Sequence, residues 1–211
     1  MPNWVSNSIK FTGSKPAITA FLNKARNVKK ISKSCSDEQF IKKVMDFNKY
    51  ECSLASWRKC PKTFENLDTT NDMRKRDSID YAHKPLFNSD EEYQQYCKKF
   101  KNVVKYQKHK YGIVGWYDYH CHIWGTKWDS EVEIKSIQKK DNDNFELELF
   151  TDTAWSPPAN WLNYLNEQFP DLHITVSYVD EGDPATTYHY DFLTDETTEE
   201  VDEEIRKLLM S

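Results

Sequence analysis

The feature that most constrains the fold is a polar turn with alternating apolar residues next to it. A run that begins at Val132 leads into residues 141–144, all Asp or Asn, and Phe145, Leu147 and Leu149 then alternate with glutamates. Successive side chains of a strand point to opposite faces, so this spacing predicts a β-hairpin with one buried face. An antiparallel sheet with one apolar face must be covered by a second layer.

Apolar periodicity predicts further elements on both sides of this hairpin. Apolar residues at every second position indicate strands, and a spacing of i, i+3, i+4 and i+7 indicates a helix. The first helix has Ser14 as its N-cap and Pro16 in its first turn. In chain order, the expected elements are a strand at 3–12 that ends at Gly13, a helix at 14–25, the hairpin, a helix that starts at Ser156 and stops at Pro170, strands at 172–178 and 187–192, and a helix capped by Thr197 with Glu200.

The order of these elements predicts the fold class. Strand, helix, strand, strand, helix, strand is the βαββαβ pattern of the ferredoxin-like fold. We therefore expect an α+β, ferredoxin-like βαββαβ sandwich with a long, mainly helical insertion after the first helix and a C-terminal strand-helix extension. Residues 1–30 and 111–211 would form the core with its extension, and residues 31–110 the basic helical insertion. The two core helices would cover one sheet face, which leaves the other face to the insertion or to a partner.

The predicted insertion is rich in Lys, Asn, Asp and Tyr and contains no clear strand pattern. Ser36 with Gln39 and Ser89 with Glu92 form capping boxes, each followed by apolar residues at helical spacing. At least two helices are therefore expected in this segment. Residues 65–80 are strongly polar and are expected to form an exposed loop.

Charge is divided between the two halves of the chain. Residues 1–110 hold 23 Lys and Arg against 12 Asp and Glu, a balance of +11, whereas residues 111–211 hold 6 against 22, a balance of −16. Three explanations remain open: a basic face that binds nucleic acid or an acidic partner, an acidic face that mimics nucleic acid, or attraction between the two halves within the fold.

The cysteines indicate reduced thiols. Their number is odd, and no pair has the C-x-x-C spacing of a zinc ribbon. One dense group of soft ligands, His120-Cys121-His122, is expected on a strand, where only the two histidines share a face, and two ligands are too few for a metal site. We therefore expect neither a metal nor another cofactor. The five cysteines are Cys35, Cys52, Cys60, Cys97 and Cys121.

The composition predicts a globular, soluble protein of the cytoplasm that does not enter the membrane. Aromatic residues make up 14% of the chain, which is too many for a disordered protein. No segment approaches the roughly 18 consecutive apolar residues of a membrane helix. The first residues also lack the basic and apolar regions of a signal peptide.

Three segments that contain tryptophan resemble a known family. They are Met1-Pro2-Asn3-Trp4 with Asn7, Trp124-Gly125-Thr126-Lys127-Trp128-Asp129, and Asp152-Thr153-Ala154-Trp155-Ser156-Pro157-Pro158 with Tyr178 beyond it. On these segments the chain resembles the YubB-type ferredoxin-like family, which is carried largely by bacteriophages and plasmids. The resemblance covers the two ends of the chain and implies the fold and a host-cell setting, but no reaction. Val5 stands where the family often has Cys, and Glu181-Gly182-Asp183 lacks the aromatic residue that usually follows.

The second and third of these segments flank the predicted hairpin at its outer ends. Residues equidistant from a hairpin turn face each other across the strands, so the two segments should meet in a tryptophan-rich corner. One interpretation is a packed rim of indoles with a salt bridge and a helix cap. The other is a binding pocket with aromatic walls and converging polar groups. The candidate ligand-binding residues are Trp124, Lys127, Trp128, Asp129, Asp152, Thr153 and Trp155.

No signature of a known reaction is found, since the chain lacks the G-x-x-x-x-G-K-[ST], G-x-S-x-G, H-E-x-x-H and G-x-G-x-x-G motifs. We therefore expect a non-catalytic interaction protein of a bacteriophage or mobile element. It would bind a host protein or ribonucleoprotein and inhibit a bacterial defence system, and binding of nucleic acid through the basic insertion is a variant of this hypothesis. The alternative is a protein that binds, sequesters or hydrolyses a nucleotide with the tryptophan-rich corner.

Overall fold

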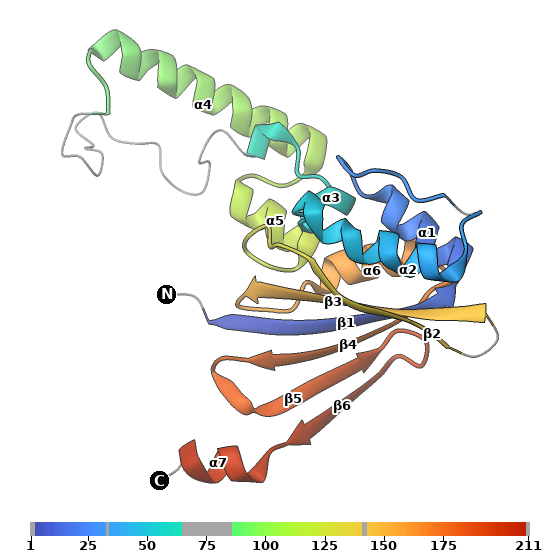
Figure 1. The fold of residues 1–211 in the computed structure, drawn as a ribbon. Helices are drawn as coiled ribbons and strands as arrows, with labels where there is room; N and C mark the ends of the chain where they lie inside the picture. Colours follow the sequence, from blue (N-terminus) through green and yellow to red (C-terminus); the bar gives the residue numbers. More distant parts are fainter. Residues whose placement is uncertain (1–2, 33, 65–85, 141–142, 210–211) are drawn as a thin grey trace. The chain divides into compact units, whose positions relative to one another are not determined.

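The computed structural model describes residues 3–32, 34–64, 86–140 and 143–209 (Figure 1). The chain divides into two compact units, one formed by Met1–Lys59 with Ile123–Ser211 and the other by Cys60–His122. The loop expected at 65–80 lies outside the described residues. Within the described ranges, no helix combines the length and the apolar character needed to cross a membrane.

The first unit is built on a six-stranded antiparallel sheet with the order β2-β3-β1-β4-β5-β6. β1 lies between β3 and β4, so the N-terminal strand pairs with segments from the other end of the chain. The predicted hairpin is confirmed, because β2 and β3 are adjacent and antiparallel. The strands are β1 (Trp4–Ser14), β2 (Glu133–Lys139), β3 (Asn144–Ala154), β4 (His173–Asp180), β5 (Asp183–Asp191) and β6 (Glu196–Val201).

Helices α1 (Lys15–Lys24), α2 (Asp37–Met45), α3 (Leu54–Trp57) and α6 (Ala159–Gln168) lie over one face of this sheet (Figure 1). Phe11 of β1 stacks on Phe21 of α1 with 4.5 Å between ring centroids, and Phe21 stacks on Trp57 of α3 at 5.2 Å. Trp57 meets Trp161 of α6 edge to face at 5.9 Å. All four rings are buried. Because large aromatic rings remove much apolar area from water, this chain of contacts forms the centre of the core.

Residues 31–59, which lie within the predicted insertion, pack in the unit that contains the sheet. Phe40 of α2 meets Phe145 of β3 edge to face, with 5.1 Å between ring centroids. Asn48, in the short helix η1 (Asp46–Tyr50), donates through Nδ2 to the carbonyl of Ile134 at 2.8 Å and accepts the Ile134 N–H at 2.7 Å. Asn48 thus satisfies backbone groups on the edge strand β2, which protects that edge from pairing with another chain.

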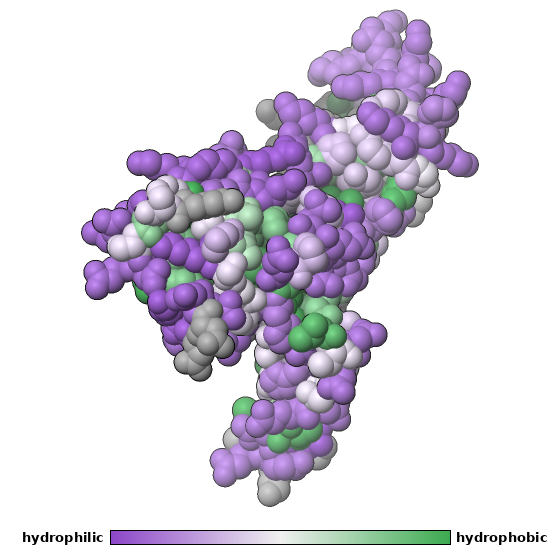
Figure 2. All heavy atoms as spheres, turned by 90° about the vertical axis from the view of Figure 1, so that its right-hand side faces the viewer, coloured by the Kyte–Doolittle hydropathy of each residue, from purple (hydrophilic) through white to green (hydrophobic). Residues whose placement is uncertain are grey.

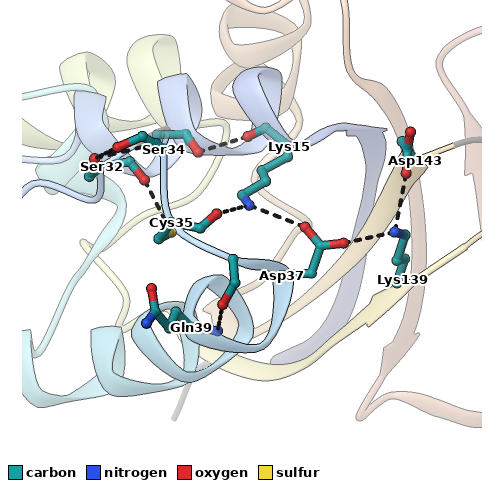
Figure 3. A network of polar contacts seen from close by, with 10 residues as sticks. Lys15, Ser32, Ser34, Cys35, Asp37, Gln39, Lys139 and Asp143 are labelled. Carbon is teal, nitrogen blue, oxygen red and sulfur yellow. Dashed lines mark hydrogen bonds and ion pairs between the residues drawn. The ribbon is translucent and has the colours of Figure 1, made fainter.

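A polar network joins the start of α2 to α1 and β2 (Figure 3). The Asp37 carboxylate accepts from Lys15 Nζ at 3.1 Å and from Lys139 Nζ at 2.7 Å. Lys139 also pairs with Asp143 at 3.1 Å, and Lys15 donates to the Cys35 carbonyl. The hydrogen bond from Lys139, followed by the one from Lys15, holds the pKa of Asp37 below its ordinary value.

The opposite face of the sheet carries polar side chains that bond across the strands. Ser6 Oγ donates to Asp152 at 2.6 Å, and Ser8 Oγ donates to Glu148 at 2.9 Å. These residues occupy the strand positions that alternate with the buried apolar ones. One face of the sheet is therefore apolar and packed against helices, and the other is hydrophilic.

The C-terminal extension contains the predicted strand, as β5, and a helix, with a further strand between them. Residues 196–201 form strand β6, which pairs with β5 in the register Tyr190↔Thr197, so the predicted helix cap at Thr197 and Glu200 is wrong. The helix α7 (Glu203–Leu209) begins after Asp202, whose carboxylate accepts the N–H of Glu204 at 3.0 Å. Threonine and valine favour strands, and β5 supplies a pairing partner that the local capping pattern could not indicate.

Gly13 is required for a close approach rather than for a turn. The residue is the last but one of β1, so the strand ends one residue later than predicted. A Cβ atom at this position would lie 2.7 Å from Leu172 Cδ2 and 2.9 Å from the carbonyl oxygen of Asp171. Only glycine, which lacks that atom, lets the segment before β4 pack this closely against β1.

The second unit contains the long helix α4 (Asp90–Tyr111), η2 (Lys62–Phe64) and most of α5 (Trp116–Trp124). Phe64 stacks on Tyr119 with 3.9 Å between ring centroids. The buried Gln107 of α4 donates to the Thr63 carbonyl at 2.8 Å and accepts the Gly115 N–H at 3.1 Å. Tyr111, the last residue of α4, meets Phe64 edge to face with 5.3 Å between ring centroids, so one aromatic cluster and one amide side chain hold the end of α4.

The helix starts expected from capping boxes are confirmed. Ser36 Oγ accepts the N–H of Gln39 at 3.3 Å, and Ser89 Oγ accepts the N–H of Glu92 at 3.2 Å. The strand expected around His120-Cys121-His122 is wrong, because these residues lie on helix α5. The buried residues Tyr119 and Ile123 are four positions apart, which is helical spacing. In so short an aromatic segment this spacing is hard to recognise from the sequence.

Candidate functional site

Exposed indoles lie at the start of β1 and just beyond the end of β3. Figure 2 shows hydrophilic residues over most of one face of the molecule, with hydrophobic residues in small, separate areas. The backbone N–H of Trp155 donates to the Asn3 carbonyl at 2.8 Å, which places Trp155 beside the start of β1. Among the described residues, the exposed large apolar side chains are Trp4, Met45, Tyr50, Tyr106, Trp155, Leu193 and Ile205.

A lysine lies between two of the indoles. Lys127 Nζ is 4.6 Å from the ring centroid of Trp128 and 4.4 Å from that of Trp155. The Trp128 ring in turn lies 6.0 Å from the ring of Trp4. We call these four residues, Trp4, Lys127, Trp128 and Trp155, the indole cluster. A cation over an indole face is worth about 0.5–1 kcal/mol at an exposed position, so the two contacts order the lysine between its rings.

Pairing of β1 with β3 brings the two exposed indoles together. In the sheet, Trp4 pairs with Ala154, the last residue of β3. Trp155 directly follows Ala154. The Trp4 backbone also exchanges two bonds with Glu181, because its N–H donates to the Glu181 carboxylate at 2.9 Å and its carbonyl accepts the Glu181 N–H at 2.9 Å. Trp4 is thus held by β3 on one side and by the turn after β4 on the other.

Side-chain hydrogen bonds fix the loop that carries Lys127. Thr126 Oγ1 donates to the Ala154 carbonyl at 2.9 Å, and Ser156 Oγ donates to the Gly125 carbonyl at 2.6 Å. Gly125 has a φ of +84°, and a Cβ at this residue would lie 2.9 Å from the N–H nitrogen of Ala159 at the start of α6. The indole cluster is therefore supported by fixed backbone, which limits the entropy lost when a ligand binds.

Asp129 supports the same loop from the other side. Its carboxylate accepts from Ser53 Oγ at 2.8 Å and from the Ala55 N–H at 3.0 Å, at the start of α3. A carboxylate at a helix N-terminus is favoured by both the free N–H groups and the helix dipole. This residue acts as the helix cap that one interpretation of the sequence anticipated.

The remaining predicted site residues do not join the indole cluster. Trp124 is buried and donates through Nε1 to the Arg58 carbonyl at 2.9 Å. Thr153 is buried and donates to the Ser156 carbonyl at 2.8 Å, whereas Asp152 lies on the polar face of the sheet and accepts from Ser6. The structure therefore brings together Lys127, Trp128 and Trp155, whereas the contacts given for Trp124, Asp152 and Thr153 are made with other residues.

Trp155 combines exposure with an unfavourable backbone conformation. Its φ is +72°, in the left-handed region that bulky residues rarely adopt, and its side chain is 48% exposed. Such a conformation costs of order 1–3 kcal/mol and concentrates at functional sites. An indole that remains half exposed gives back only part of that energy by burial. The stability of the fold therefore gives no sufficient reason for a tryptophan at position 155.

Trp4 belongs to the site but was absent from the residues proposed from the sequence. It is 43% exposed and contacts Trp128. The sequence contains a signal for it, because Trp4 is part of the first of the three resembling segments. Its place in the cluster could not be predicted because Trp4 is far along the chain from the other two indoles, and only the pairing of β1 with β3 brings it beside them.

The indole cluster offers aromatic faces and one cation, which suit binding rather than acid-base chemistry. Across the part of the chain that the structure describes, no group of three or more His, Cys, Asp or Glu side chains is arranged to hold a metal ion. The cluster's chemistry is thus apolar contact, stacking and cation–π attraction.

Residues 124–208 match the model of a family described as a ferredoxin-like domain in Api92-like protein. The matched region begins at the last residue of α5, ends within α7, and includes Lys127, Trp128 and Trp155 of the indole cluster. A ferredoxin-like domain is thereby supported for this part of the chain, within a mixed helix and sheet structure. No curated protein and no solved structure matches the chain.

Proposed function

We propose that the protein is a non-catalytic interaction module that binds a protein partner through the indole cluster. The observation that carries this proposal is the half-exposed Trp155, kept in a left-handed backbone conformation and stacked on Lys127. Tryptophan is among the residues that supply most of the binding energy in protein interfaces, where a few aromatic side chains dominate. Three indoles on a fixed backbone present this kind of surface.

The support beneath the cluster favours binding without a large rearrangement. The bonds from Thr126 and Ser156 hold the loop to the end of β3, and Asp129 holds it to α3. A partner would therefore meet an ordered surface and would lose little binding energy to loop ordering. The protein is proposed to belong to a bacteriophage or mobile element. Its partner is proposed to be a host protein or ribonucleoprotein, and binding would inhibit a bacterial defence system.

We further propose that β1, α1, β2, β3, α6 and β4 form a ferredoxin-like βαββαβ core. The order β2-β3-β1-β4 within the sheet supports this assignment, and so does the family match over the C-terminal part. In this interpretation the second compact unit is an insertion in the connection between α1 and β2. The indole cluster then lies at one end of the central strands of the core.

The binding proposal is tested with the full chain and a double variant, Trp4→Ala with Trp155→Ala. A matched control, Tyr50→Ala with Leu193→Ala, removes two exposed apolar side chains outside the cluster. The unchanged chain and the control should retain one dominant partner from a host lysate, and the Trp variant should not. With the purified partner, calorimetry should then show affinity at least about tenfold weaker for the Trp variant alone. Equal affinity for all three proteins would refute the proposal.

A second candidate is nucleotide binding at the same cluster. Lys127 between two indoles is the observation that favours it, because a base can stack on an indole while the ammonium meets a phosphate. Titration of ATP, GTP and nucleoside monophosphates against the intrinsic tryptophan fluorescence separates the two candidates. Saturable quenching that Lys127→Gln abolishes would support the nucleotide, and its absence supports the protein partner.

A further inference from the structure

Helix α4 of the second unit has an unusual distribution of charge. Its acidic residues are confined to the first turn, at Asp90, Glu91 and Glu92, where the helix dipole favours them. From Tyr93 to Tyr111 the helix carries six lysines and neither Asp nor Glu, and every one of these lysines is exposed. Most of the helix surface is therefore cationic. The six are Lys98, Lys99, Lys101, Lys105, Lys108 and Lys110.

Four of these lysines lie on one face of the helix. Lys98, Lys101, Lys105 and Lys108 are spaced at i, i+3, i+7 and i+10, which is the spacing of side chains along a single helical stripe. A rise of 1.5 Å per residue makes this stripe about 15 Å long. We call these four residues the lysine stripe.

The fold does not account for this stripe. Lysines three and four residues apart repel each other on a helix surface. No ion pair joins the stripe to an acidic side chain among the residues that the structure describes. The helix dipole favours lysine only within the last turn, so it does not compensate Lys98, Lys101 or Lys105. An external anion would compensate all four.

An exposed aromatic ring lies on the helix face next to the stripe and shares a hollow with Lys98. Tyr106 is 46% exposed, and its hydroxyl accepts from Lys110 Nζ at 2.9 Å. Tyr106 lines a shallow hollow together with Lys98, Lys99 and Asn102. A cationic surface with an exposed ring combines the two groups that bind single-stranded nucleic acid, phosphate contacts and a stacking platform for a base. An acidic protein would need the charges but not the ring.

From this arrangement we infer that the lysine stripe binds the phosphodiester backbone of a nucleic acid, with Tyr106 as a stacking surface for an unpaired base. This surface is independent of the indole cluster, because it lies in the other compact unit. Binding through phosphates releases counterions, so the logarithm of affinity should fall linearly with the logarithm of salt concentration. Four phosphate contacts predict a slope of about −3 for a single strand, and about −3.6 for a duplex.

The test uses the full chain and fluorescence anisotropy with labelled single-stranded DNA, single-stranded RNA and duplex DNA of about 16 nucleotides or base pairs. Salt is varied between about 50 and 200 mM. The test variant replaces all four lysines of the stripe with glutamine, which preserves helix propensity. The control replaces four exposed lysines of the first unit with glutamine and therefore has the same net charge. Its positions are Lys24, Lys29, Lys42 and Lys43.

We expect the stripe variant to bind at least about tenfold more weakly at low salt and to lose most of the salt slope. The control should stay within about twofold of the unchanged chain. Tyr106→Ala should weaken single-strand binding by about fivefold or more and leave duplex binding unchanged. Equal losses in the stripe variant and the control would overturn the inference, and so would the absence of binding by the unchanged chain.

A poly-glutamate competitor distinguishes nucleic acid from an acidic protein. At equal concentration of negative charge, the peptide should displace the oligonucleotide poorly, because it offers neither phosphate groups nor bases. Displacement as efficient as that by unlabelled oligonucleotide, with the same loss in the stripe variant, would assign the surface to an acidic protein and overturn the inference.

Discussion

The ammonium of Lys127 lies 4.4 Å from the ring centroid of Trp155, whose own backbone is left-handed with a φ of +72°. The contact joins the loop before β2 to the residue that follows β3. It thereby adds to the hydrogen bonds that already join these two segments. The relationship leads to predictions about both stability and binding.

At position 155, glycine should give a more stable protein than alanine, which is the reverse of the usual order. Trp155→Gly should be more stable than Trp155→Ala by about 1 kcal/mol, because glycine adopts a positive φ without the steric cost that a Cβ imposes. Urea unfolding of the two variants measures the difference. The same pair at Trp4, the first residue of strand β1, is the control and should give the opposite order, since glycine weakens a strand. An Ala variant at least as stable as the Gly variant at position 155 would contradict the role of φ.

The contact between Lys127 and Trp155 should appear as a coupling energy. In a double-mutant cycle with Lys127→Met and Trp155→Ala, we expect a coupling of about 0.5–1 kcal/mol in the free energy of unfolding. Methionine keeps an unbranched side chain without the charge, so the cycle reports the cation rather than the packing. Lys127→Arg should retain the coupling, because guanidinium also binds indole faces. A coupling of zero in the Met cycle would show that the two side chains are merely adjacent.

The contribution of Asp37 to stability should depend on pH. Its pKa is lowered in the folded chain, chiefly by the hydrogen bond from Lys139, so its contribution is present in full above the unfolded value of about 3.9. The contribution is lost as the pH falls through the lower, folded pKa. Asp37→Asn should therefore be less stable than the unchanged chain at pH 7, and the difference should shrink in strong acid.

Denaturant unfolding at several pH values measures this difference. Glu38→Gln is the control, because it removes a carboxylate from the same first turn of α2 and leaves the bonds to Lys15 and Lys139 in place, so it should lose less stability at pH 7 than Asp37→Asn. A stability difference for Asp37→Asn that is constant from pH 7 into strong acid would show that the ion pairs with Lys15 and Lys139 are not its cause.

Gly13→Ala should destabilise the first unit by about 1–3 kcal/mol, because the added Cβ meets both a side chain and a backbone oxygen. Leu172→Ala in the same chain removes only the side-chain contact and leaves the carbonyl of Asp171 in place. The double variant should therefore remain at least as unstable as Gly13→Ala alone. Thermal or urea unfolding checks both, and recovery in the double variant would mean that the backbone contact is relieved.

Local patterns predicted the elements that local interactions form. The alternation of Phe145, Leu147 and Leu149 gave the hairpin, and Ser36 and Ser89 marked two helix starts that the structure confirms. At Thr197 the same kind of pattern failed. A capping box involves only four residues. Here the backbone hydrogen bonds to the neighbouring strand β5 contribute more, and the local sequence around Thr197 does not indicate that this strand is adjacent.

The candidate site was predictable only in part. Lys127, Trp128 and Trp155 meet as expected from the symmetry of the hairpin. Asp152 and Thr153 are neighbours on a strand, so their side chains point to opposite faces of the sheet and cannot share one pocket. This consequence follows from strand geometry alone.

The sequence by itself determined the helices and strands that caps and periodicity specify, the division of charge, and the lysine stripe of α4. These features depend on residues within a few positions of one another. Only the tertiary structure decided that β1 lies between β3 and β4, that Trp4 joins the indole cluster, and that Trp155 adopts a positive φ. Each of these depends on contacts between segments far apart in the chain, and the energy of such contacts is not recorded in any local pattern.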